Sequence, residues 1–495
     1  MGPLPDPSLY QDQAIPIYNR PTVPLVQAQS AQQQPSLYSY SPYPATHPSY
    51  PGYPTYPEYP SYGPYYDGVP HDYYPAPAQP RRDRYLLAMA IVSFAGSILV
   101  LLAGCASLLF LVLIIVLPAT RTLPTSLLFG GTVQSVALTL AFLIGGGFGL
   151  YHSTRALFLK KPSADFKLPQ FWIFLLLYAG VMLIASSLRS EGQAVANTPL
   201  AVMLIILAGS LPAIAALALG ARHVHFPRSA SWSTSWRRFS LAIISGTTLA
   251  IAIAGAVELA LVMFVSVVLK VRGFSIINLD QPLPQDTGTV GLVLVVVSVI
   301  APLVEEAVKP LAVVAMIGRM RSAAEAFVLG LACGVGFDLI ETCGYIATGY
   351  RDWFDVALQR SSAGLLHGFG AGMVALGWYY LTHPGSNRHR TMLGFGCWAY
   401  AVLQHAIWNG SSFLQILPAP IGPSLSGNVP LGPYSFPAFP LVLVAESLLM
   451  VAFFVYVTGK LRGQGTGTPV LLQESGSNVQ EAQKATLRTL GAIEN

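Results

Sequence analysis

The hydrophobic pattern divides the chain into a polar head and a long series of apolar runs. Residues 1–80 show no apolar periodicity, whereas apolar runs follow one another from about residue 86 to about residue 458. Each run approaches or exceeds the roughly 20 residues that an α-helix needs to cross the hydrocarbon core of a bilayer. The pattern therefore predicts an all-α, polytopic bundle of about ten transmembrane helices.

These predicted spans lie at 86–117, 125–150, 171–188, 200–220, 240–269, 290–317, 324–349, 361–381, 392–414 and 439–458. Lys and Arg gather at 81–84 and then in the loops after the second, fourth, sixth, eighth and tenth spans. Cytoplasmic loops are the ones that carry an excess of these residues. Both termini are therefore predicted to be cytoplasmic, and the cell (plasma) membrane is the expected location of the protein.

The composition agrees with lipid as the solvent of this protein. Hydrophobic residues make up 53% of the 495 positions and charged residues only 10%, against roughly 25% charge in a soluble domain. Ordinary soluble enzymes are thereby excluded. The formal net charge of +5 is spread thinly along the chain, so no nucleic-acid partner is expected.

The polar head is rich in Pro, Tyr, Gln and Ser, and its most repetitive part runs from Ser41 to Gly68. Frequent prolines remove backbone donors and fix φ, which predicts a disordered tail with polyproline II character. The tail is either a passive flexible segment or a ligand for proline-recognising partners. Four regions are predicted: a disordered cytoplasmic tail at 1–84, N-terminal transmembrane helices at 85–285, a catalytic transmembrane region at 286–458 and a cytoplasmic tail at 459–495.

Ionisable residues inside the spans carry the candidate chemistry, because an isolated charge is costly in a bilayer and usually marks a functional site. They cluster in four consecutive spans: Glu305, Glu306 and Lys309 in the sixth, Asp338 and Glu341 in the seventh, His367 in the eighth and His405 in the ninth. Phe337 directly precedes Asp338, and Asn409 follows His405 by four residues. The prolines at 302 and 310 are expected to kink the sixth span, which would bring these groups to one level.

The spacing suits acid–base chemistry. Lys309 lies four residues after Glu305 and three after Glu306, so its ammonium can neutralise only one of the two carboxylates. The surplus negative charge is suited to a general base. Two ways of activating water remain open: a glutamate base with His or Asn stabilising the oxyanion, or a metal held by Glu and His.

Four short motifs occur in order on these spans. EEAVK at 305–309 matches EExxK, FDLIE at 337–341 matches FxxxE, His367 is a lone membrane histidine, and HAIWN at 405–409 is similar to HxxxN. In this order they resemble the PrsW intramembrane protease family, a distant relative of the type II CAAX prenyl proteases and the bacteriocin-processing membrane proteases. The resemblance covers about residues 290–415.

The resemblance implies hydrolysis of a peptide bond in or beside the membrane, in membrane-anchored regulatory proteins. It assigns Glu305, Glu306, Glu341, His367 and His405 to the catalytic set. Lys309, Phe337 and Asn409 would support that set. A divalent metal such as zinc would be bound by Glu306, Glu341, His367 and His405.

Other interpretations of the same residues stay open. The Glu-Glu-Lys group could be a buried ion pair that only fixes helix register, and Asp338 has no motif behind it. Glu258 and Glu446 are intramembrane acids outside the motifs, with a packing role as plausible as a functional one. Buried acids and histidines would also suit a proton-coupled transporter, although no inverted repeat is present. A non-catalytic scaffold is the third alternative.

Overall fold

The computed structural model describes residues 84–117, 125–159, 161, 163–164, 166–190, 198–225, 234–271, 286–320, 322–383, 388–412, 424, 427–431 and 434–464. The chain divides into two compact units, Met1–Leu87 and Ala88–Asn495, and the helix bundle belongs to the second. The predicted tails at 1–84 and 459–495 lie outside the described residues except at their inner ends, so their disorder and their partners stay predictions.

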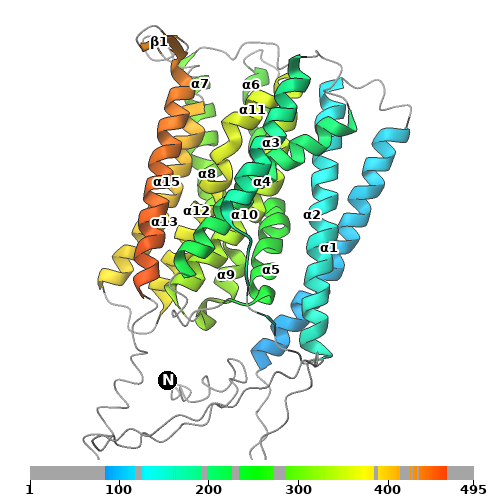
Figure 1. Cartoon of the computed structure of the whole chain (residues 1–495), viewed down its shortest axis with the longest axis vertical. Helices are drawn as coiled ribbons and strands as arrows, with labels where there is room; N and C mark the ends of the chain where they lie inside the picture. The colour runs from blue at the N-terminus through cyan, green and yellow to red at the C-terminus, as the bar shows by residue number, and fades with distance from the viewer. Residues whose placement is uncertain are drawn as a thin grey trace, which may run out of the picture. The chain divides into compact units, whose positions relative to one another are not determined.

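Upright helices dominate the described part of the chain (Figure 1). The first group comprises α1 (Arg84–Val116), α2 (Thr125–Leu157), α3 (Phe171–Ser190), α4 (Pro199–His225), α5 (Trp236–Ser245), the π-helical η5 (Gly246–Ala250) and α6 (Ile251–Val271). The second group comprises α7 (Thr287–Val295), the π-helical η6 (Val296–Ile300), α8 (Ala301–Val308), α9 (Leu311–Ala315), the 3-10 turn η7 (Ile317–Arg319) and α10 (Ala323–Thr348). The third comprises the 3-10 turn η8 (Tyr350–Asp352), α11 (Trp353–Gln359), the 3-10 turn η9 (Arg360–Ser362), α12 (Ala363–Thr382), α13 (Arg388–Ser412) and α15 (Ala438–Gln464).

Eight helical stretches among the described residues are long and apolar enough to cross a membrane. The predicted helix bundle is confirmed, but the predicted count of about ten is not reached, because α12 and α13 are not among these eight. For α12 the surroundings explain its composition: every residue from Ala363 to Gly377 is buried in the protein. Its glycines and its histidine therefore meet other helices instead of lipid.

The core of the bundle is α10, which packs against α12, α4, α5 and α2. In the most apolar 18-residue stretch of α10, 94% of the residues are buried inside the protein, whereas the corresponding share in α1 is 6%. The most apolar helix is thus the most lipid-exposed, and the central helix carries ionisable groups. This is the distribution expected when lipid, and not water, surrounds the fold.

Local sequence explains how α10 starts and how closely it packs. The hydroxyl of Ser322 accepts a hydrogen bond from the backbone N–H of Glu325 and caps the first turn. Further along, Gly334 lies against the backbone carbonyl of His367, where any Cβ would collide with it. A glycine at this position therefore lets α12 approach α10 closely enough to share one site.

Two elements depart from the predicted pattern. A short antiparallel hairpin, β1 (Asn428–Leu431) with β2 (Tyr434–Pro437), pairs Asn428 with Pro437 and Leu431 with Tyr434. The short helix α11 lies where a loop was predicted. Both lie between spans, where hydropathy carries no signal about backbone structure.

Candidate active site

The predicted site residues come together from four helices. Glu305 and Glu306 lie on α8, Asp338 and Glu341 on α10, His367 on α12 and His405 on α13. The predicted break occurs at the sixth span: α8 ends at Val308, and Pro310 begins the separate short helix α9. Lys309, at this break, is fully buried.

Lys309 is the centre of the cluster. Its ammonium Nζ lies 2.7 Å from Glu306 Oε1, 2.9 Å from Glu305 Oε2 and 2.7 Å from His367 Nδ1. It also lies 4.6 Å from the centre of the Phe337 ring. An ammonium group can only donate, so Nδ1 of His367 must accept this hydrogen bond.

His405 is oriented by Glu306. The distance between His405 Nδ1 and Glu306 Oε1 is 2.9 Å, and His405 Nε2 lies 3.7 Å from Glu305 Oε2. A carboxylate facing Nδ1 favours the tautomer that carries its proton there, which leaves the Nε2 lone pair directed at Glu305. Gly370 makes room for this arrangement, because a Cβ on it would lie 2.7 Å from Glu306 Oε2.

The opposite edge of the His367 ring faces α10. His367 Nε2 lies 2.8 Å from Glu341 Oε2 and 3.8 Å from Asp338 Oδ1. Because Nδ1 accepts from Lys309, the neutral ring carries its proton on Nε2, towards these carboxylates. The Asp338 carboxylate also accepts a hydrogen bond of 2.7 Å from the Thr342 hydroxyl.

Several polar atoms in this cluster are buried without a well-formed hydrogen bond to any described residue: Glu305 Oε2, Glu306 Oε2, Asp338 Oδ2, Glu341 Oε2, His367 Nε2 and His405 Nε2. Some of them lie within ion-pair distance of a neighbour, but at angles that give no hydrogen bond. Leaving such groups unsatisfied is costly, so the cluster is suited to holding water or an ion.

Two groups of side chains within the described residues could hold a metal ion. Glu305, His367 and His405 form one, and Asp338, Glu341 and His367 form the other, with ligand atoms within 4.8 Å of one another in each. Glu305 and His405 fit best. The Nε2 lone pair of His405 is free to bind a metal, and Glu306 faces the other ring nitrogen. A carboxylate commonly occupies this position behind a metal-bound histidine and orients its ring. His367 fits less well, because Lys309 occupies its Nδ1.

Two predicted supporting residues lie at the edge of the cluster. Asn409 donates from Nδ2 to the backbone carbonyl of Val297, 3.1 Å away, and so ties α13 to η6. The Phe337 ring contacts Lys309, as described above, and lies 5.6 Å from the His367 ring.

The site also contains two residues that the motifs do not include. The Glu258 carboxyl group on α6 lies close to that of Glu305. Arg360 in η9 lies 3.6 Å from Glu341 Oε1, donates to Thr342 Oγ1 at 3.2 Å and stacks on the Tyr345 ring. An acid inside a span was a sequence signal for Glu258, whereas Arg360 looked like an ordinary loop cation.

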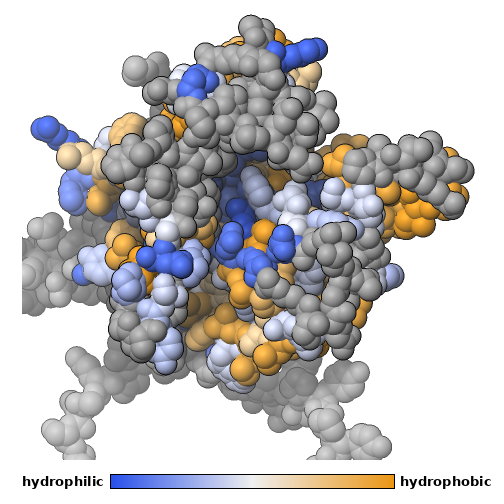
Figure 2. All heavy atoms as spheres, turned by 90° about the horizontal axis from the view of Figure 1, so that it is seen from above, coloured by the Kyte–Doolittle hydropathy of each residue, from blue (hydrophilic) through white to orange (hydrophobic). Residues whose placement is uncertain are grey.

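The cluster is least buried on the side of Glu341 and Arg360, whose side chains are 17% and 13% exposed. Figure 2 looks down on the bundle from above, the end where α11 is labelled in Figure 1, and shows hydrophilic side chains gathered in a central hollow.

Comparison with known families gives one match. Residues 234–445 match the family model described as PrsW family intramembrane metalloprotease. The chain contains a PrsW-type protease region. This PrsW region includes every residue of the cluster, Glu258 and Arg360 among them. No match was found among curated proteins or among solved structures.

The PrsW match and the apolar helices together identify an integral membrane protein with a membrane-embedded protease region. Its surroundings are therefore lipid, and a membrane protein is the substrate that such a region implies. The family description includes a metal, and the Glu305, His367 and His405 group is a set of side chains that could bind one.

Proposed function

We propose that this protein hydrolyses a peptide bond in or near the membrane-spanning segment of membrane-anchored regulatory proteins. The observation that carries the proposal is the buried convergence of adjacent glutamates with two histidines. His405 lies within 3.7 Å of Glu305 and 2.9 Å of Glu306, and His367 lies 3.8 Å from Glu305. Such a set can bind water, accept its proton and stabilise the charge that develops on the carbonyl oxygen.

In this proposal Glu305 accepts the proton of the attacking water as its oxygen bonds to the carbonyl carbon. Glu305 then returns that proton to the leaving amine as the C–N bond breaks. Glu306 keeps His405 in one tautomer, and Lys309, which pairs with both glutamates, offsets one of their two negative charges. In the metal alternative, Glu305 and His405 would hold a divalent ion such as zinc, which would supply Lewis-acid polarisation and a more acidic water in place of the Glu305 base.

His367 and Glu341 have a second role in the proposal. The Nε2–H of His367 lies 2.8 Å from Glu341 without a well-aligned hydrogen bond to it, so this proton is available to donate to negative charge that develops on the substrate. Glu341 holds the ring in the orientation that permits this donation. Asp338, which lies 3.8 Å from His367 Nε2, adds to the negative field on this side of the ring.

The orientation in the membrane is part of the proposal. Loop charges favour both termini in the cytoplasm, and the plasma membrane is the proposed location. The loop that holds Arg360 then lies on the outer side, so the least buried side of the cluster faces out. Tagging each terminus and testing its access to protease in intact cells would check this orientation.

Cleavage by the purified, reconstituted protein tests the activity. A panel of single-span substrates should be cut by the wild type, and Glu305→Gln, Glu306→Gln, His367→Ala and His405→Ala should each lower the rate by about 10²- to 10⁴-fold. His389→Ala is the matched control, because His389 is exposed at the start of α13. Cleavage at the wild-type rate by Glu305→Gln and His405→Ala would contradict the mechanism. Proton flux that needs these residues, without cleavage, would instead support a transporter.

A further inference from the structure

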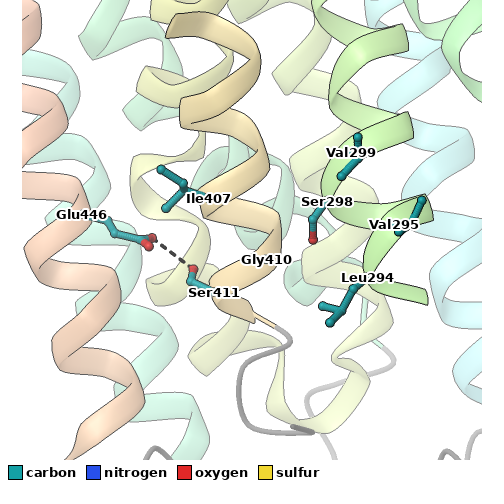
Figure 3. Close-up of a pocket in the computed structure, with 8 residues that line it drawn as sticks. All are labelled: Leu294, Val295, Ser298, Val299, Ile407, Gly410, Ser411 and Glu446. Atoms are coloured by element: carbon teal, nitrogen blue, oxygen red, sulfur yellow. Dashed lines mark hydrogen bonds between the residues drawn. The ribbon is translucent and has the colours of Figure 1, made fainter. Parts of the chain in front are cut away.

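A cavity of about 430 Å³, open to the outside of the bundle, lies near the cluster between α7, η6, the end of α13 and α15 (Figure 3). Three of its lining side chains, Val295, Val299 and Ile407, are about half exposed. Its walls are largely apolar and include Leu294, Val299 and Ile407. The size falls within the range of pockets that bind small ligands or side chains. No step of the proposed hydrolysis uses it.

Three polar side chains interrupt the apolar wall. Figure 3 shows Ser298 pointing from η6 into the cavity, while Glu446 on α15 faces Ser411 on α13. The Ser411 hydroxyl donates to Glu446 Oε2 over 3.1 Å. The Ser298 hydroxyl is buried without a hydrogen bond to any described residue. The cavity thus offers a carboxylate acceptor and an unsatisfied hydroxyl in otherwise apolar surroundings.

The cavity and the catalytic cluster lie about one to two turns apart on the same two helical stretches. Ser298 precedes Glu305 by seven residues, and Gly410 follows His405 by five, which places the cavity about 8 to 10 Å from the cluster along the helix axes. Going from Glu305 to Ser298 and going from His405 to Gly410 lead towards the same end of the bundle, because the Asn409 side chain donates a hydrogen bond to the Val297 carbonyl there. An extended peptide covers this distance in roughly two to three residues.

A peptide bond inside a helix must leave the helical conformation before a protease can reach it. Unwinding in lipid exposes backbone N–H and C=O groups that water cannot satisfy. Glu446 can accept from such an N–H, and Ser298 can donate to such a carbonyl. The apolar walls suit the side chains of a transmembrane sequence.

We infer that this cavity is a substrate subsite, which binds a bulky apolar side chain two to three residues from the scissile bond, together with the unwound backbone beside it. The inference rests on the proposed protease function. Its ligand class is an unwound apolar peptide segment, bound through Glu446 and Ser298. Val299 and Leu294 set the size of the side chain that fits.

Photocrosslinking tests binding without requiring catalysis. A photoreactive amino acid at Leu294, placed in the Glu305→Gln background, should crosslink to a reconstituted single-span substrate within three residues of the bond that the wild type cuts. The same group at Leu449, which is 72% exposed on α15, is the matched control and should capture lipid. Capture of lipid alone from Leu294 would overturn the subsite, even if the wild type cleaves.

Changing the size of the cavity and of the substrate side chain tests whether the cavity selects substrates. Val299→Trp should fill the cavity and lower kcat/KM at least about tenfold for substrates with Leu or Phe at the subsite position, and Ala or Gly at that position should restore cleavage. Leu449→Trp should cleave all substrates like the wild type. Equal cleavage of every substrate by Val299→Trp would overturn the inference.

The polar contact has its own test. Glu446→Leu should raise KM about tenfold, whereas Glu446→Gln keeps an acceptor oxygen and should stay close to the wild type. Equal KM values in the wild type and Glu446→Leu would exclude this contact. If no substrate is cut by the wild type but Leu294 still crosslinks near one position, the protease proposal fails and the binding site stands.

Discussion

His405 Nδ1 and Glu306 Oε1 lie 2.9 Å apart, and this contact directs the other ring nitrogen of His405 towards Glu305. The two adjacent glutamates therefore have different surroundings. Glu306 is held by His405 and Lys309 through one oxygen, whereas Glu305 lies beside the free nitrogen of His405. Adjacent carboxylates in a sequence motif need not share a role. Here the contacts suit Glu306 to orienting His405 and Glu305 to reacting.

Metal binding should distinguish these two glutamates. Glu306→Gln should lower zinc affinity by about 10- to 100-fold, as expected when the hydrogen-bond partner of a metal-bound histidine is lost. Glu305→Gln should lower it further, because a ligand is removed. Competition of the purified variants with a chelator measures this without any substrate. Asp338→Asn is the comparison: if it weakens zinc binding as much as Glu305→Gln, the ion belongs to the second group of ligands.

Lys309 should be essential for stability as well as for the site. Lys309→Met leaves the two glutamates buried without their cation and should destabilise the protein by about 3–5 kcal/mol. Adding Glu306→Gln should recover part of that loss, since the double variant buries one carboxylate fewer. Thermal unfolding in detergent measures both effects. Lys460→Met, at an exposed position of α15, should change the stability by less than about 0.5 kcal/mol.

Close packing of α10 on α12 predicts the effect of a single methyl group. Gly334→Ala would push against the backbone carbonyl of His367 and should destabilise the protein by about 1–3 kcal/mol. It should also lower cleavage by displacing the His367 ring. The control is Gly396→Ala on α13, where a Cβ meets nothing within 4 Å. That change should be neutral or stabilising by up to about 1 kcal/mol, and equal effects of the two substitutions would contradict the packing argument.

Arg360 is expected to act as a positioning residue for Glu341. Arg360→Ala should lower kcat roughly 10- to 100-fold with little change in KM, because Glu341 loses a charged partner that positions it. Arg360→Lys should restore part of kcat, since a cation returns without the fork geometry of the guanidinium. Arg388→Ala, at the exposed start of α13, should leave kcat unchanged. A rise in KM alone would indicate a role in substrate binding.

The candidate cluster was predictable from sequence because ionisable residues are conspicuous in apolar spans. Glu305, Glu306, His367 and His405 could be selected on that ground alone, and Pro310 does break the helix as predicted. Arg360 could not be selected, because a cation in a loop between spans carries no signal until the fold brings it to Glu341. The hairpin at 428–437 and α11 escaped prediction for a similar reason, since loops have no hydropathy pattern.

The sequence by itself determined that the chain resides in a membrane and which of its apolar runs carry ionisable groups. These properties are local, because they depend on the free energy of placing each segment in lipid. Only the tertiary structure decided which nitrogen of His405 faces Glu305, that Glu258 joins the site and that a cavity adjoins it. Those properties depend on contacts between helices far apart in the chain. Close packing at positions such as Gly334 makes these contacts possible, and the hydropathy pattern does not encode them.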